Sequence, residues 1–501
     1  MALDVQRPDL TIAVIGCGVM GQGIAQVAAQ AGCRVLMFDA KGGAAGAAKD
    51  AIAGALSRLV ERGKLNQAQV TAALDLLQPV GQLADVATAQ IAIEAIVESL
   101  AAKHALLRAL EPVVAADCLI ATNTSSLSVT AIGAAARHPA RVAGFHFFNP
   151  VPLMKVVEVI DGALTAEWLE PVLSAFARRL GHRPVKAKDT PGFLVNHAGR
   201  GYGTEALRIL SEGVADAATI DAILKGACGF RMGPFELLDL TGLDVSHPVM
   251  ESIYHQFYEE PRFRPSPITA QRLAGGLLGR KTGRGFYDYA GKQEAAPITA
   301  RGARPDSAWI ADGPNAELIA GMAMKAGVRI GSPQSASLIV VPMLGDDTTS
   351  AVHRLGLDPA KSVGIDALFG LDRHRTLVAT PATERSRRDG ALALFTADGT
   401  AASMIADSPG AVAQRVLATI VNIACDIAQQ RIATPEDIDA AVTLGLGYPQ
   451  GPLAWGDAIG AQKILAILER LLSITGDPRY RPSLWLRRRA LLGLSLTHPE
   501  D

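Results

Sequence analysis

Cysteine is scarce in this sequence, and its scarcity bears on both the redox compartment and metal binding. The 501 residues include only five cysteines, and no two of them are spaced as C-x-x-C. An odd number of scattered thiols fits neither a disulfide framework nor a structural zinc site, so we expect no metal. The pattern favours a reducing, cytoplasmic location. The cysteines are Cys17, Cys33, Cys118, Cys228 and Cys425.

Long apolar runs and an excess of one charge are also missing. The formal net charge is −1 and no long Lys/Arg tract occurs, which argues against a surface for nucleic acid or an anionic membrane. No run approaches the 18 apolar residues that a membrane span needs, and the first residues do not resemble a signal peptide. With aromatics at 5% and 49 glycines, the composition is typical of a globular protein in which small-residue helices pack on sheets.

The N-terminal part of the chain, up to residue 190, alternates between strand and helix patterns. "LTIAVIG" and "RVLMFDA" predict strands, and the segment between them predicts a helix, as in a βαβ unit. Gly16, Gly18 and Gly21 form G-x-G-x-x-G at the turn, where backbone N-H groups can approach a pyrophosphate. Asp39 ends the second strand and can accept hydrogen bonds from both ribose hydroxyls. Because a carboxylate there repels a 2′-phosphate, we expect NAD rather than NADP.

Polar residues follow two later strands of this predicted parallel sheet. "IAIEAIVES" ends on Glu94 and Glu98, and "CLIATNTSSLSV" continues into Asn123, Ser125 and their neighbours. Ligands of open parallel sheets bind at the carboxyl ends of strands, so these side chains are candidates for cofactor or substrate contacts. The alternative, that the Ser/Thr group only caps the next helix, stays open at this point.

One histidine and one glutamate interrupt two otherwise apolar runs in "AGFHFFNPVPLMKVVEVI". An unpaired carboxylate at Glu158 would carry a large desolvation cost, so it needs a partner, and His146 is the nearest candidate. Pro150 and Pro152 predict a rigid turn that can fold the second run back beside the first. A histidine held by a carboxylate can act as a general base, although a structural ion pair is the alternative.

These motifs together resemble the 3-hydroxyacyl-CoA dehydrogenase family. The similar segments are "EAIVES" with Lys103, "NTSSL", "GFHFFNP", "VEVI" and "KDTPGFLVN", within residues 10 to 290. The resemblance implies NAD-dependent oxidation of a (3S)-3-hydroxyacyl-CoA to the 3-oxoacyl-CoA, with an acyl-CoA as the partner molecule. It implies that His146 is the base and Glu158 its partner, that Ser125 and Asn196 reach the substrate oxygen or the base, that Glu98, Lys103 and Asn149 surround the nicotinamide half, and that Ser57 and Lys64 contact coenzyme A. Lys64 could equally be a solvated lysine at a helix end.

The C-terminal half contains an internal repeat. The segment from Pro191 can be laid on the segment from Pro409 at a constant offset, which also aligns Gly233-Pro234 with Gly451-Pro452. At the site position the first copy has Asn196 and the second has Gln414, so we expect only the first to be catalytic. The second copy is expected to bury the apolar face of the first, as an internal pseudo-dimer partner would. A homodimer of whole chains is also open.

The predicted fold class is an α/β Rossmann domain followed by all-α dehydrogenase C-terminal domains in two copies, with a small α/β insert between them. The expected domains are 1–188 (NAD-binding Rossmann domain), 189–290 (first helical domain), 291–400 (linker and small α/β domain) and 401–501 (second helical repeat).

This arrangement resembles long-form family members of bacterial phenylacetate degradation, for which the implied substrate is 3-hydroxyadipyl-CoA. Arg200, Arg208 and Arg231 are the cations available for a distal carboxylate, although the default interpretation is that they are solvated arginines on helix surfaces. One alternative is a 3-hydroxybutyryl-CoA dehydrogenase. Another is a catalytically idle, crystallin-like NAD(H)-binding protein, which we would expect to have lost the base or its partner.

Overall fold

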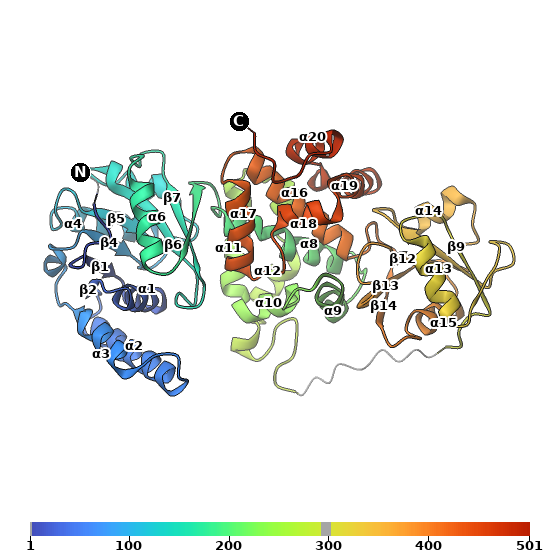
Figure 1. Cartoon of the computed structure of the whole chain (residues 1–501), viewed down its shortest axis with the longest axis horizontal. Helices are drawn as coiled ribbons and strands as arrows, with labels where there is room; N and C mark the ends of the chain where they lie inside the picture. The colour runs from blue at the N-terminus through green and yellow to red at the C-terminus, as the bar shows by residue number, and fades with distance from the viewer. Residues whose placement is uncertain (1–2, 292–301, 501) are drawn as a thin grey trace. The chain divides into compact units, whose positions relative to one another are not determined.

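The computed structural model of the chain (Figure 1) describes residues 3–291 and 302–500. These residues group into two compact units. The first unit holds the residues up to His197 together with Gln430–Gly447. The second holds Ala198–Gln429 and the chain from Tyr448 onward. This division differs from the four consecutive domains predicted from the sequence, because a late segment packs with the first sheet. Most of the predicted linker, 292–301, lies outside the described residues.

The first unit is built on an eight-stranded sheet with the order β3-β2-β1-β4-β5-β6-β7-β8. Neighbouring strands are parallel except for the antiparallel pair β6 and β7. The prediction of a Rossmann-like parallel sheet is confirmed. The strands are β1 Thr11–Ile15, β2 Arg34–Phe38, β3 Leu77–Pro79, β4 Ile91–Glu94, β5 Leu119–Thr122, β6 Val142–Phe147, β7 Val156–Asp161 and β8 Arg183–Lys188.

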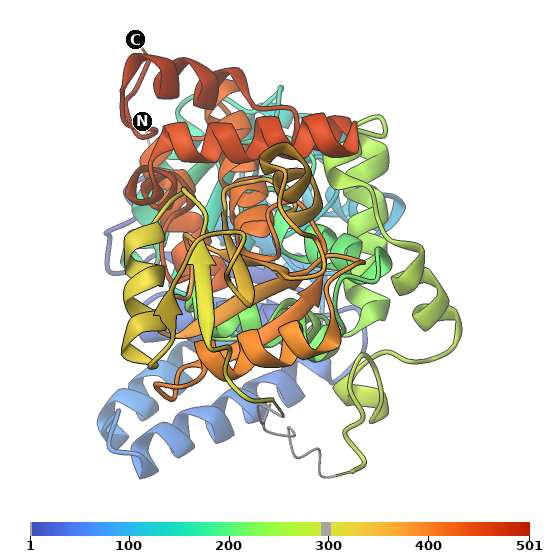
Figure 2. The ribbon, with the colours of Figure 1, turned by 90° about the vertical axis from the view of Figure 1, so that its right-hand side faces the viewer.

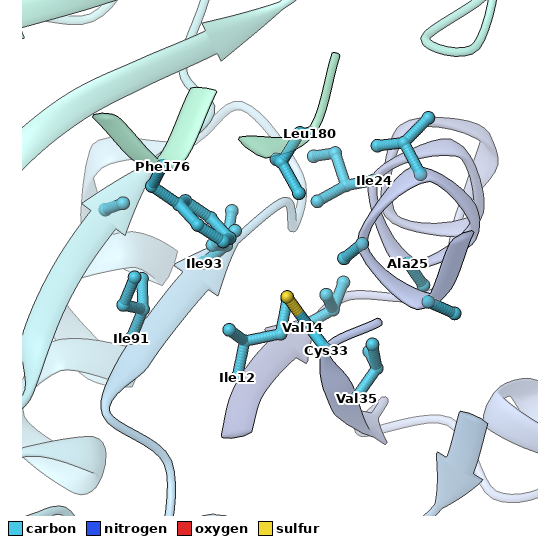
Figure 3. Close-up of a cluster of buried hydrophobic side chains, with 14 of the residues drawn as sticks. Ile12, Val14, Ile24, Ala25, Cys33, Val35, Ile91, Ile93, Phe176 and Leu180 are labelled. Atoms are coloured by element: carbon cyan, nitrogen blue, oxygen red, sulfur yellow. The ribbon is translucent and has the colours of Figure 1, made fainter. Parts of the chain in front are cut away.

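Helices cover both faces of this sheet, since alternate residues of each central strand are buried on opposite sides. Figure 3 shows one side, where Phe176 of α6 points toward Ile93 of β4 and Ile24 of α1 points toward Leu180. On the other side, Ala13 and Ile15 pack with α4 and α5. The helices of this unit are α1 Val19–Gln30, α2 Ala44–Glu61, α3 Gln67–Leu76, α4 Leu100–Leu110, α5 Val129–Gly133, α6 Leu169–Arg179, α7 Val195–Ala198 and α17 Pro435–Leu446.

The second unit contains a six-stranded sheet, drawn in yellow and orange in Figure 2, with the order β10-β9-β11-β12-β13-β14. It is parallel except between β12 and β13. β14 begins just after the domain boundary predicted at residue 400 and pairs with β13 along its whole length. The strands are β9 Ser307–Ile310, β10 Arg329–Ile330, β11 Leu338–Met343, β12 Ser362–Asp366, β13 His374–Ala379 and β14 Ala401–Ala406, and the covering helices are α13 Ala316–Lys325, α14 Thr348–Leu355 and α15 Arg385–Phe395.

The remainder of the second unit is helical, and α16 lies at its centre against α8. The fully buried guanidinium of Arg415 on α16 joins these helices by ion pairs with Glu205 and Glu212. The starts of α17, α18 and α19 follow those of α9, α10 and α11 at the same offset at which Pro409 follows Pro191. The helices are α8 Arg200–Ser211, α9 Ala217–Cys228, α10 Pro234–Thr241, α11 Leu243–Gln256, α12 Pro267–Ala274, α16 Ala413–Gln429, α18 Pro452–Ile459, α19 Ala461–Thr475 and α20 Leu484–Leu492.

Within the described residues, no helix combines the length and the apolarity needed to cross a membrane.

Candidate active site

His146 and Glu158 face each other across the antiparallel strands β6 and β7, whose register pairs them directly. The Nδ1 atom of His146 lies 2.5 Å from Oε2 of Glu158, and the carboxylate has no exposed surface. With Nδ1–H donating to the carboxylate, the free lone pair of the imidazole is on Nε2. The pair can therefore accept a proton at Nε2 and stabilise the resulting imidazolium.

The second oxygen of Glu158 is held by a turn that sequence reasoning did not connect to it. Oε1 accepts hydrogen bonds from the backbone amides of Leu194 at 2.9 Å and Val195 at 2.8 Å. The turn reaches this position through two consecutive positive φ angles, at Gly192 (74°) and at Phe193 (49°), where a non-glycine residue is strained. Both carboxylate oxygens are therefore occupied.

Asn196 follows this turn directly, at the start of α7, and is partly buried. The same stretch of chain carries Asp189, whose carboxylate accepts hydrogen bonds from Ser128 Oγ and from the amides at the start of α5, Val129 and Thr130. Asp189 thus caps α5 and anchors the beginning of the "KDTPGFLVN" segment to that helix.

A buried ammonium group organises the ends of β4 and β5. Lys103 on α4 is 1% exposed, and its Nζ lies 2.7 Å from Oε1 of Glu94 and 3.4 Å from Oε2 of Glu98. The other oxygen of Glu94 accepts a hydrogen bond from Thr122 Oγ1 at 2.7 Å. Lys103 therefore ties the two glutamates predicted at this edge into one charged network.

Glu98 gathers the Ser/Thr cluster that follows β5. Its Oε1 accepts hydrogen bonds from Thr124 Oγ1 at 2.7 Å, from the amides of Ser125 and Ser126, and from both serine hydroxyls. Burial would raise the pKa of Glu98, but these hydrogen bonds and the charge of Lys103 outweigh it and hold the pKa below its ordinary value. These hydrogen bonds fix the positions of the three polar side chains, whereas α5 begins later, at Val129, with Ser128 as its N-cap.

The glycine turn after β1 fits a dinucleotide. A methyl group on Gly16 would lie 2.5 Å from the carbonyl oxygen of Ala95, and one on Gly21 would overlap the carbonyl oxygen of Gly16. Gly18, in contrast, faces open space, which is where a pyrophosphate could approach the backbone. The Asp39 carboxylate lies beside this turn and accepts a hydrogen bond from the Cys17 amide at 2.8 Å. These residues can therefore hold NAD.

Three other residues predicted for the site are exposed on the surface. Asn149 is exposed in the loop between β6 and β7, next to a cis peptide bond with Pro150. Ser57 donates its hydroxyl to the carbonyl of Ala53 within α2, and Lys64 is exposed just beyond the end of that helix. The assignment of Ser57 and Lys64 to coenzyme A therefore stays a prediction.

Among the arginines considered for a distal carboxylate, Arg208 already has acidic partners. Its guanidinium pairs with Glu212 at 2.8 Å and Asp477 at 3.2 Å.

Comparisons with known proteins agree with this geometry. Residues 11–190 match the sequence model of the 3-hydroxyacyl-CoA dehydrogenase NAD binding domain, and residues 192–289 and 410–495 each match the model of the C-terminal domain. The chain is 39% identical to the 3-hydroxyadipyl-CoA dehydrogenase of Escherichia coli K12 over 98% of this chain and 99% of that protein.

Other relatives support the same grouping. A crystal structure of 3-hydroxybutyryl-CoA dehydrogenase from E. coli K12 superposes with a TM-score of 0.87 at 38% identity, covering 97% of this chain and 98% of the other. A probable 3-hydroxybutyryl-CoA dehydrogenase of Bacillus subtilis is 39% identical to this chain. The alignment covers 98% of the B. subtilis protein but only 56% of this chain.

Proposed function

The chain belongs to the 3-hydroxyacyl-CoA dehydrogenase family and is an NAD-dependent oxidoreductase, and on this premise we propose that it oxidises (3S)-3-hydroxyadipyl-CoA to the 3-oxoacyl-CoA. Support for the dicarboxylic substrate is the near full-length similarity to a protein named for that activity. The second candidate is 3-hydroxybutyryl-CoA, because a protein with that name is similar over nearly the same length.

The observation that carries the assignment of roles is the 2.5 Å contact between His146 and Glu158. In the proposed reaction, Nε2 of His146 takes the proton of the 3-hydroxyl group while the C3–H bond breaks with its electron pair. Bound NAD supplies the acceptor for that hydride. Glu158, fixed by two amides and the imidazole, stabilises the imidazolium, and Ser125 and Asn196 orient the substrate oxygen.

The cofactor is assigned to the carboxyl edge of the first sheet. Gly16, Gly18 and Gly21 are proposed to receive the pyrophosphate and Asp39 the adenosine ribose. The remaining assignments in this region are Glu98, Lys103, Ser125 and Asn149 for the nicotinamide half, and Ser57 and Lys64 for coenzyme A.

A catalytically idle NAD(H)-binding protein is the alternative of another class. Loss of the base or of its carboxylate would be its expected signature. Here His146, Glu158, Ser125 and Asn196 are all retained, and the first two are in contact, which favours an enzyme.

We further propose that the helices of the second unit, together with α17, form two copies of one domain. The support is the common offset between corresponding helices and the two matches to the C-terminal domain model. The second copy would then be an internal pseudo-dimer partner. The five scattered cysteines, none of them spaced as C-x-x-C, support a cytoplasmic location.

A substrate panel tests the proposal. The rate of NADH formation at 340 nm would be measured with 3-hydroxybutyryl-, 3-hydroxyhexanoyl- and 3-hydroxyadipyl-CoA, and kcat/KM should be at least about tenfold higher for the adipyl thioester. A higher kcat/KM for 3-hydroxybutyryl-CoA would select the second candidate. NADH binding without turnover of any thioester would indicate an idle protein.

A further inference from the structure

The segment Gln430–Gly447 belongs to the unit of the catalytic sheet, although it comes late in the chain. It lies along the edge strand β8. The amide of Lys188 donates to the carbonyl of Ile432 at 3.1 Å, and the amide of Lys186 donates to Oδ2 of Asp437 at 3.3 Å. The free edge of the sheet is thus closed by this segment, which includes α17.

One residue of α17, Gly445, packs very closely against the rest of the first unit. Gly445 lies against Val195 and Val156, so that a Cβ atom there would be 3.2 Å from both γ-carbons of Val195 and 3.3 Å from Cγ1 of Val156. These distances are shorter than an ordinary contact between carbon atoms. Only glycine lets the helix approach this far without displacing its neighbours.

Both neighbours of Gly445 are linked to Glu158, one by a hydrogen bond and the other along the same strand. Val195 donates its amide to Glu158, and Val156 lies two residues before Glu158 on β7. We infer that α17 is a positioning element for Glu158 and that Gly445 is its positioning residue, an inference that rests on the proposed role of His146 and Glu158. A shift of the turn at Val195 would move the two amides that hold the carboxylate.

The second unit repeats this docking with its own sheet. The amide of Ala406, which corresponds to Lys188 at the offset of the repeat, donates to the carbonyl of Val214 at 2.9 Å, and Val214 corresponds to Ile432 at the same offset. Helix α9 packs on β13, where Gly226 lies against His374. The segment with α17 therefore covers the first sheet, and the segment with α9 covers the second sheet. This reciprocal arrangement is the one that subunits adopt in a two-fold dimer.

The chemistry is not repeated in the second unit. At the offset of the repeat, Thr376 stands in the place of Glu158 and Gln414 in the place of Asn196. The same docking therefore occurs in a unit that has Thr376 and Gln414 in place of Glu158 and Asn196, so docking alone does not show that α17 positions Glu158. The two roles can be separated by experiment.

The test is Gly445→Ala in the full-length enzyme. The added methyl group should displace Val195 by a few tenths of an ångström and lower kcat by about 3- to 30-fold, with KM for NAD and the acyl-CoA within about twofold of the wild type. Adding Val195→Ala to this variant removes the opposing γ-carbons, so kcat should recover to that of Val195→Ala alone. Exchange of the Leu194 and Val195 amides with deuterium should be faster in Gly445→Ala and restored in the double variant.

The control is Gly321→Ala in α13, a helical glycine where a Cβ would have no atom within 4 Å, and kcat should not change. If Gly445→Ala lowers the melting temperature but leaves kcat and amide exchange unchanged, α17 is only architectural and the inference is wrong. If it cannot be purified folded, Val195→Ala alone carries the test, because it loosens the same contact without adding bulk. His146→Gln is assayed in parallel, and full activity of that variant would overturn the proposed function instead.

Discussion

Replacing Glu158 by glutamine tests the catalytic pair through the tautomer of His146. Glutamine keeps the size of the side chain, and its amide can be oriented in only one way at this site. The amides of Leu194 and Val195 both donate to Oε1, so the carboxamide oxygen must occupy that position. The carboxamide NH2 then faces Nδ1 of His146 and donates to it. In consequence the imidazole proton moves to Nε2, the atom that should accept the substrate proton.

The expected loss of turnover is large. With the wrong tautomer in place and no carboxylate to stabilise the imidazolium, kcat should fall by about 10³- to 10⁴-fold, equivalent to roughly 4 to 5.5 kcal/mol of transition-state stabilisation. His146→Gln, which removes the base itself, should lower kcat by about 10²- to 10⁴-fold. Because the two residues act as one unit, the double variant should lose much less than the product of the single losses.

Two measurements separate chemistry from binding. Single-turnover formation of NADH at 340 nm gives the rate of the chemical step, and quenching of protein fluorescence gives the Kd for NADH. The Kd should stay within about twofold of the wild type, because neither side chain is assigned to the cofactor. A Glu158→Gln variant that keeps about a third of wild-type kcat but has a lower melting temperature would show a structural ion pair and refute the reasoning.

Three further outcomes follow from other residues. Because the Asp39 carboxylate lies beside the glycine turn, kcat/KM should be at least about tenfold higher with NAD than with NADP, and equal values would contradict the assignment. A chain cut near residue 290 loses α17 and should aggregate or self-associate through the exposed surface, so a stable, fully active monomer in analytical ultracentrifugation would show that the second half is dispensable. Burial raises the pKa of Asp366 from 3.8 to about 6, despite the hydrogen bond from Gln414, so stability present at low pH is lost as the pH rises through that interval. Asp366→Asn should therefore raise the free energy of unfolding at pH 8 by on the order of 3 kcal/mol and have little effect near pH 4, and an equal gain at both pH values in urea melts would contradict this.

The features of the fold and site that depend on local sequence could be predicted. The glycine turn, the parallel sheet and the pairing of His146 with Glu158 follow from short motifs and from the need of a buried carboxylate for a partner. The antiparallel hairpin that joins β6 and β7 supplies the register. These predictions concern residues that are close to one another in the sequence or that belong to one recognisable motif.

The features that were missed depend on long-range contacts. No local pattern reveals that the amides of Leu194 and Val195 hold Glu158, because almost every residue type carries a backbone amide that can donate. α17 docks on β8, where the amide of Lys186 donates to Asp437, which lies 251 residues away along the chain. The repeat predicted that the second helical copy buries the apolar face of the first, but it did not predict that α17 packs on the first sheet. β14 begins just after residue 400, where the small α/β domain was predicted to end, and "AASMIA" is so short that only its pairing with β13 identifies it as part of the sheet.

The hydrogen bond from Lys188 to Ile432 joins two segments of one chain, and this has a consequence for how the enzyme behaves on dilution. A subunit contact is lost when the protein concentration falls below its dissociation constant, whereas a tethered contact keeps a constant effective concentration. We therefore expect the edge of the first sheet to stay closed when the protein is diluted, and specific activity should be the same at nanomolar as at micromolar enzyme.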